Sequence, residues 1–198
     1  MVCEWQVTDP SCDDFDELAL LVFESAPEPL TACFSPNSAA QTLAFLRYAF
    51  ATQAGQYGYQ NHKVVRDQNK VIGVACAWHS ELPKDFDTQT LKTLHGFFGL
   101  TQSMDILARN AVLAKQTVPP EANDLIIGHI SVDPDFRRLG VASTLVAHFL
   151  AHATSLGKQR VIIDVNRHNS LALKCYQNLG FKQTNNIASE YFRLCREL

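Results

Sequence analysis

The sequence is poor in three features: excess charge of one sign, long apolar runs near its start, and closely spaced cysteines. Lys and Arg number 17 against 20 Asp and Glu, which gives a net charge of −3. This balance argues against a broad surface for nucleic acid or anionic membranes, although a local basic pocket is compatible with it. The start, MVCEWQVTDPSCDD, is acidic, and the longest apolar run near it, Leu18 to Phe23, is far too short to cross a bilayer. We therefore expect a soluble, cytoplasmic protein that has neither nucleic acid nor a membrane as its partner.

The cysteines and histidines lack the usual metal-binding spacings. The six cysteines include no C-x-x-C pair and are scattered at Cys3, Cys12, Cys33, Cys76, Cys175 and Cys195. Their even number is compatible with three disulfides, but the chain is neither small nor visibly secreted, so we predict reduced, mostly buried thiols. His148 and His152 have the i, i+4 spacing of metal ligands on a helix, yet the residues between them supply no general base. We interpret both as helix residues that meet solvent and expect no metal.

The order of helices and strands indicates the fold class. Hydrophobic residues make up 46% and charged residues 19% of 198 residues, which is typical of one globular domain. Period-two and helical patterns predict strands at 4–8, 62–66, 70–78, 125–132, 160–165, from 181 and at 190–194, and helices at 15–25, 38–54, 140–155 and 169–179. Residues 27–37 are predicted as a proline-punctuated loop. Because helices alternate with strands, we predict an α/β protein with a mixed sheet.

Residues 84–118 stand between two predicted strands and have apolar residues at helical spacing. We predict two helices here, broken near Gly96 and Gly99. A core-packing role is favoured over a substrate lid. Phe97, Phe98 and Leu100 cluster at the break, and we expect this cluster to shape the acceptor side of the cleft.

A first motif, Arg137-Arg138-Leu139-Gly140-Val141-Ala142, joins the strand at 125–132 to the next helix. Free backbone N–H groups and the positive end of a helix meet at such a junction, which suits a phosphate group. Gly140 and Ala142 let an anion approach the backbone, and the two arginines add positive charge. An ordinary connection with a turn glycine is the alternative interpretation.

A second motif, Asn169 to Phe181, begins just after the strand at 160–165. Asn169 and Tyr176 are seven residues apart, about two helical turns, so their side chains project to nearly the same face of a helix. Gly180 ends that helix and Phe181 begins a strand. Alternatively, Asn169 is a helix N-cap and Tyr176 a partly buried core residue.

Together the two motifs resemble the GCN5-related N-acetyltransferase (GNAT) family. The pattern Arg or Gln, x, x, Gly, x, Gly or Ala is matched from Arg137 to Ala142, and Asn, x, x, Ala, x, x, x, Tyr, then Gly-Phe is matched from Asn169 to Phe181. The resemblance implies one domain over residues 1–198, with a mixed, mostly antiparallel central sheet and helices on both faces. Its fourth and fifth strands, 125–132 and 160–165, would be parallel and splayed. The helical insertion at about 84–118 departs from the family pattern, which has a short turn there.

The resemblance also implies acetyl-CoA as cosubstrate, bound between the splayed strands without a metal. The pyrophosphate would lie on the cradle formed by Arg137, Arg138, Leu139, Gly140, Val141, Ala142 and Ser143. The pantetheine arm would pair like an added strand with Ile130, Ser131 and Val132, and Asn169 would contact the arm.

The implied reaction is direct attack of a primary amine on the thioester, with backbone N–H groups of 130–132 stabilising the oxyanion. Tyr176 matches the family's general acid for the departing thiolate. The sequence leaves three candidates for the general base: Asp124 at the strand edge, His129 and a chain of water molecules. Strict alternation places His129 on the face of Leu125 and Ile127, where a satisfied buried histidine is the favoured interpretation.

Two functions of different class remain: an N-acetyltransferase, or a non-catalytic acyl-CoA-binding regulatory module. Tyr176 favours the enzyme, because a pure binder needs only the pyrophosphate cradle. The acceptor would be a small-molecule amine or a protein amino group, and the sequence is compatible with a homodimer.

Overall fold

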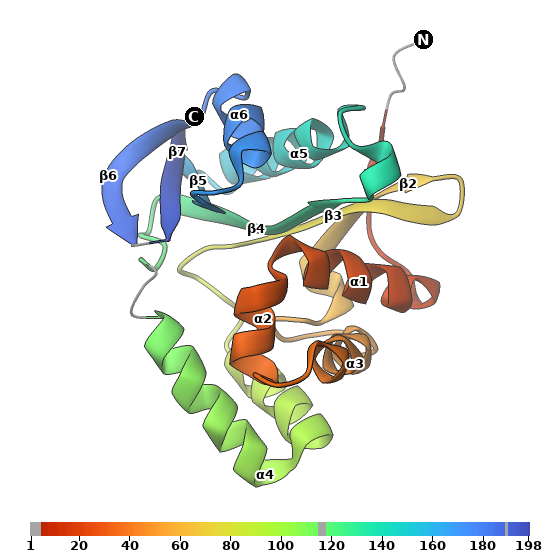
Figure 1. Cartoon of the computed structure of the whole chain (residues 1–198). Coiled ribbons are helices and arrows are strands. Elements are labelled where there is room, and N and C mark those ends of the chain that lie inside the picture. Colours follow the sequence, from red (N-terminus) through yellow and green to blue (C-terminus); the bar gives the residue numbers. More distant parts are fainter. Residues whose placement is uncertain (1–4, 115–117, 189) are drawn as a thin grey trace.

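The computed structural model describes residues 5–114, 118–188 and 190–198, which form a seven-stranded sheet flanked by helices (Figure 1). The strand order is β1-β2-β3-β4-β5-β7-β6, and within the described residues β4 and β5 run parallel whereas the other neighbouring strands are antiparallel. The strands are β1 (Val7–Thr8), β2 (His62–Asp67), β3 (Lys70–Trp78), β4 (Asp124–Val132), β5 (Arg160–Asn166), β6 (Lys182–Ala188) and β7 (Tyr191–Glu197). The predicted fold class, a mixed and mostly antiparallel sheet, is confirmed.

Helices lie on both sides of the sheet, α5 and α6 on one side and α1 to α3 on the other, and α4 packs against α2 and α3 on the same side as these (Figure 1). They are α1 (Phe15–Ser25), α2 (Pro27–Phe34), α3 (Ala39–Phe50), α4 (Phe86–Ala114), α5 (Val141–Ser155) and α6 (Ser170–Asn178). Neighbours on β2 point in opposite directions, so Val64 joins the core under α1 to α4 and Val65 joins the core under α5 and α6. Among the described residues, no helix is both long and apolar enough to cross a membrane.

The prediction of a loop at 27–37 is wrong, because α2 occupies most of it. Pro27 and Pro29 stand in the first turn, where a helix needs no backbone N–H donor and proline is tolerated. Leu30, Cys33 and Phe34 are buried, and this packing outweighs the local signal of the prolines.

Helix and strand ends differ from the predictions by a few residues. Ser38 caps α3, accepting a hydrogen bond from the Gln41 amide (3.1 Å), and the helix ends at Phe50 rather than near Gly55. The first strand is shorter than the predicted 4–8: β1 spans Val7–Thr8, Trp5 and Gln6 precede it without strand structure, and Glu4 lies outside the described residues. Cys3 lies outside them too, as does the side chain of Cys12, whereas Cys33, Cys76, Cys175 and Cys195 are free thiols as predicted.

The insertion forms two helical segments within α4 that meet at Gly99, where φ is 73° and ψ is 175°. Phe97 and Phe98 pack against Phe45 of α3, with ring centroids 5.7 and 5.0 Å apart. The Arg109 guanidinium donates to the carbonyl oxygens of Cys33 (2.7 Å) and Phe34 (3.2 Å) at the end of α2. These contacts bear out the core-packing interpretation, and the rings at the break face α3.

Candidate active site

The two parallel strands β4 and β5 form a fork. Asp124–Ile127 of β4 pair with Arg160–Ile163 of β5, and no further pairing between the two strands is found in the described residues. Beyond this point β4 continues to Val132, while β5 continues to Asn166 paired with β7. The facing edge of β4 from residue 128 to 132 therefore has no strand partner on β5, which confirms the predicted splay.

A β-bulge on β4 lies at the opening of the fork. Cys76 pairs with Gly128 and Val74 with Ser131, so β4 advances three residues where β3 advances two. His129 occupies the bulge with φ at 52°, in the left-handed region. Before the bulge Leu125 and Ile127 face the α5 and α6 core, and after it Ile130 and Val132 do.

The extra residue turns His129 to the opposite face, toward α1 to α4. Its ring neighbours there are Tyr57, His62 and Trp78. The prediction that strict alternation places His129 beside Leu125 and Ile127 is wrong, because alternation counts every residue and a bulge adds one.

The junction between β4 and α5 has the geometry expected of an anion cradle. Gly140 caps α5 with φ at 92°, and Arg138 also has positive φ, at 63°. The first amide of α5 to donate into the helix is that of Thr144, to Gly140, so the amides of residues 141–143 have no intrahelical acceptor. The side of Gly140 where a Cβ would stand is open space.

Two side chains brace this junction. The Trp5 indole N–H donates to the Leu139 carbonyl (2.8 Å), and Arg137 Nε donates to the Val132 carbonyl (3.2 Å). Arg138 is exposed and forms no ion pair within the described residues. Two hydrogen bonds therefore brace the cradle, and the positive charges of Arg137 and Arg138 adjoin it.

The second motif lies on α6, next to the first turn of α5. Asn169 is the N-cap, its Oδ1 accepting from the Ala172 amide (3.1 Å), and it is exposed. Tyr176 is buried in the α5 and α6 core, 6.3 Å from the ring of Phe181, and burial raises the pKa of its phenol. The structural roles considered for both residues are thus present, and neither conflicts with a role in binding or catalysis. Ser143 of α5 lies close enough to the Cys175 thiol of α6 to act on its pKa, which burial raises.

A cluster of His62, Cys76 and His129 lies on the other face of the fork. His62 Nε2 is 3.2 Å from His129 Nδ1, and Cys76 Sγ is 3.3 Å from the same nitrogen. His62 and Cys76 are buried, while His129 is partly exposed. Burial lowers the pKa of His129 to about 4, and burial with the neighbouring His129 lowers that of His62 to about 3. Sequence analysis did not single out His62, and no local pattern marks it.

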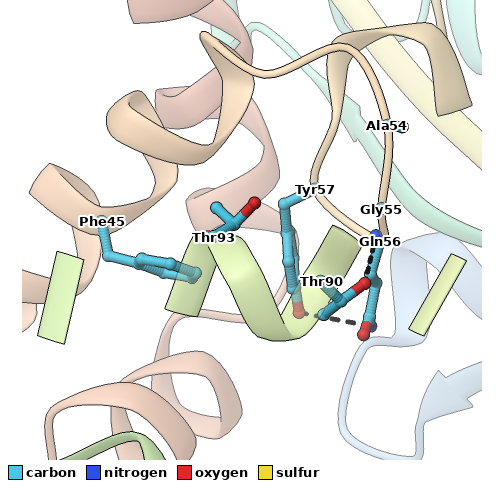
Figure 2. A pocket seen from close by; sticks show the side chains of 7 residues that line it. All are labelled: Phe45, Ala54, Gly55, Gln56, Tyr57, Thr90 and Thr93. Carbon is cyan, nitrogen blue, oxygen red and sulfur yellow. Dashed lines mark hydrogen bonds between the residues drawn. The ribbon is translucent and has the colours of Figure 1, made fainter. Parts of the chain in front are cut away.

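A small hollow lies between the loop before β2 and the first half of α4 (Figure 2). Tyr57 lines it beside Phe45 and Thr93, and the Gln56 amide donates to Thr90 Oγ1 (2.8 Å), as Figure 2 shows. The Tyr57 ring also lies 5.5 Å from that of His129. The insertion thus holds the loop that packs against the His129 side of the fork.

Comparison with known proteins gives the family. Residues 22–181 match the acetyltransferase (GNAT) family. Because the match covers most of the chain, this chain belongs to the GNAT family of acetyltransferases.

Individual relatives match shorter stretches. Human N-acetyltransferase 8 is 39% identical over 56 residues, 28% of this chain and 25% of that protein. The ribosomal protein bS18-alanine N-acetyltransferase of Salmonella typhimurium is 33% identical over 64 residues, 32% of this chain and 43% of that protein. The match therefore spans less than half the length of these curated relatives.

Solved structures share the whole fold. A crystal structure described as an acetyltransferase has a TM-score of 0.71 at 24% identity, covering 97% of this chain and 98% of that one. The PaiA N-acetyltransferase of Thermoplasma acidophilum, in complex with coenzyme A, has a TM-score of 0.55 at 11% identity, covering 98% and 99%. At these identities the likeness is one of fold.

Proposed function

We propose that this protein is an acetyl-CoA-dependent N-acetyltransferase that acts on a primary amine by direct attack on the thioester. The observation that carries the proposal is the fork between β4 and β5, which opens beside a cradle of free amides at the start of α5. A strand edge without a partner suits an extended amide-containing arm, and free amides at a helix N-terminus suit a pyrophosphate. Family membership and the coenzyme A complex of a structural neighbour support the same ligand.

In this proposal, the cofactor spans both features. The pyrophosphate lies on the amides of residues 138–143, with Arg137 and Arg138 beside it, and the pantetheine arm pairs with Ile130, Ser131 and Val132. Asn169 contacts the arm from the start of α6. No metal takes part in this binding mode.

Tyr176 is the residue proposed to act on the leaving group, the thiolate of coenzyme A. Proton transfer from a phenol of pKa ~10 to a thiolate of pKa ~8.5 is uphill by about 2 kcal/mol. Burial raises the pKa of Tyr176 and makes full transfer less favourable still. Tyr176 therefore acts chiefly as a hydrogen-bond donor to the departing sulfur, and backbone N–H groups of 130–132 stabilise the oxyanion.

His129 is the proposed proton acceptor for the amine. The bulge places it at the opening of the fork and on the face away from α5. Burial, which lowers the pKa of His129 to about 4, keeps the ring neutral, so the imidazolium formed when it accepts a proton must be stabilised within the site. Asp124, the other side chain considered, is buried and bound to Arg160 (2.7 Å) at the closed end of the fork, which argues against it.

The acceptor is a small-molecule amine or a protein amino group. The relative from Salmonella typhimurium is named as an N-acetyltransferase of an alanine in a ribosomal protein, which supports a protein amino group as the acceptor. In this proposal the chain forms one domain, works in the cytoplasm and has neither nucleic acid nor a membrane as its partner. The four free thiols are compatible with a reducing compartment.

The test is an acetyl-CoA turnover screen against a panel of polyamines, amino acids, aminoglycosides and peptide N-termini, read by release of free thiol. We expect thiol release with at least one amine and none without an acceptor. Tight coenzyme A binding without turnover on any amine would favour the non-catalytic binding module instead.

A further inference from the structure

The proton positions in the histidine cluster can be deduced from its buried end. His62 Nδ1 lies 3.2 Å from the carbonyl oxygen of Gly58. A carbonyl oxygen only accepts, so this nitrogen carries the proton. Because burial keeps His62 neutral, the ring has one proton, and its Nε2 has a bare lone pair.

That lone pair determines the proton of the next ring. His62 Nε2 faces His129 Nδ1 at 3.2 Å, and two bare nitrogens at this distance would repel. His129 Nδ1 therefore carries a proton and donates it to His62. Since His129 is also neutral, its Nε2 has no proton. Of the three residues in the cluster, His129 is the one that is partly exposed.

The ring geometry fits a hydrogen bond rather than a shared metal ion. The two planes are within 8° of parallel, and the centroids are 5.5 Å apart although the facing nitrogens are 3.2 Å apart. Parallel rings reach so large a centroid separation only when the nitrogens point at each other in line, edge to edge. A tetrahedral ion needs ligand lone pairs that converge at a common centre off that line, so the closeness of His62, Cys76 and His129 does not make a zinc site here.

The other neighbours of His129 carry no charge. Burial raises the pKa of the Cys76 thiol, which donates to the Gly128 carbonyl (3.6 Å) while its sulfur lies near His129 Nδ1. Burial likewise raises the pKa of Tyr57, and Trp78 is neutral. Among the described contacts of His129, the strong acceptor for its Nδ1 proton is therefore His62.

We propose that His62 is a positioning residue, which holds His129 in the tautomer with a bare Nε2 and stabilises the imidazolium that forms during acetyl transfer. This inference rests on the proposed function. In the step, the amine nitrogen bonds to the acetyl carbon, the carbon–sulfur bond breaks, and the thiolate leaves. The amine proton moves to His129 Nε2 and later to solvent, while the proton between His129 and His62 stays in place.

The experiment compares two substitutions at one position. His62→Leu removes the acceptor, whereas His62→Gln keeps an oxygen that can accept from His129. We expect His62→Leu to lower kcat about 10- to 100-fold, since loss of a group that orients a catalytic histidine has effects of this order. KM for acetyl-CoA should stay within about twofold, and His62→Gln should retain most of the activity. His152→Leu, the same change at an exposed histidine, is the matched control.

A second readout is independent of turnover. Nitrogen-15 NMR of labelled histidine should give a bare Nε2 for His129 in the native protein and a shift toward the opposite tautomer in His62→Leu. In the double variant with His129→Ala, His62→Leu should cause no additional loss of kcat.

Five outcomes would overturn parts of this proposal, each a different part. An equal loss of kcat in both His62 variants, accompanied by a fall in Tm and an unchanged tautomer, would reduce His62 to a structural role. A native His129 with a protonated Nε2, or stoichiometric zinc in the purified protein, would overturn the proton assignment. Unchanged turnover in His129→Ala would remove the proposed base, and a native protein inert toward every amine would remove the proposed function itself.

Discussion

The indole N–H of Trp5 donates to the carbonyl oxygen of Leu139, 2.8 Å away, across 134 residues of sequence. The Trp5 ring also meets Phe136 edge to face, with centroids 6.3 Å apart. A residue near the start of the chain thus supports the loop whose amides form the proposed pyrophosphate cradle.

Trp5→Phe keeps an aromatic ring but removes the donor. Because one neutral hydrogen bond contributes about 0.5–1.5 kcal/mol, we expect the Kd for coenzyme A to rise by roughly 2- to 10-fold with little change in kcat. Isothermal titration calorimetry checks the first value and thiol release the second. A kcat loss at unchanged Kd would show that the contact serves another part of the site.

Gly140→Asp introduces a side chain and a negative charge on the open side of the cradle. We expect coenzyme A binding to weaken at least 10-fold, because the carboxylate would stand beside the phosphates at a positive helix end. Gly157→Asp is the matched control: Gly157 follows the other end of α5, has φ at 68° and also faces open space. Equal losses of affinity in both variants would indicate strain and not the cradle.

Tyr176→Phe removes one hydroxyl from a buried ring. We expect kcat to fall by about 10- to 10⁴-fold, the range for loss of a proton-donating group, while the Kd for coenzyme A stays the same. Single-turnover measurements are needed so that chemistry, not product release, is observed. Full activity in that assay would exclude Tyr176 from the reaction.

Phe98→Ala tests the insertion. Replacing a fully buried phenylalanine by alanine lowers the free energy of unfolding by about 3–5 kcal/mol. Because Phe98 is only partly buried, we expect its replacement to lower it by about 2 kcal/mol. Leu100→Ala, at a side chain 67% exposed, should change it by less than about 0.5 kcal/mol. Because the Phe98 ring faces α3, we expect KM for the amine to stay constant. A changed amine KM at normal stability would instead support the prediction that the break shapes the acceptor side.

The two buried histidines predict a pH dependence of stability. Their folded pKa values, about 3 for His62 and about 4 for His129, lie below the ordinary 6.5, so the unfolded state binds more protons as the pH falls below about 6.5. The contribution of the two neutral histidines to the free energy of unfolding is therefore fully present above pH 6.5 and is lost as the pH falls toward 4. Urea unfolding at pH 7 and pH 5 checks this decline, and His62→Leu should lessen it. An unchanged slope in that variant would contradict the depressed pKa of His62.

Local patterns in the sequence were sufficient for much of the fold. The helix at 15–25 and the strand at 70–78 were predicted with their observed bounds, because apolar periodicity and turn residues act over a few neighbours. Both motifs that form the cradle and the start of α6 were found in the same way. The loop predicted at 27–37 failed because burial of Leu30 and Phe34, a tertiary effect, decided in favour of a helix.

The sequence by itself determined the family, the class of fold and the two segments that would hold the cofactor, because each of these depends on residues close together in the chain. Only the tertiary structure decided which face His129 occupies, since the bulge that turns it arises from the pairing of β4 with β3. It also decided the partner of His129: His62 is 67 residues away, and the two rings meet because β3 and its neighbours bring the strands into one sheet. A proton position deep in a protein depends on such long-range contacts, and no local pattern encodes them.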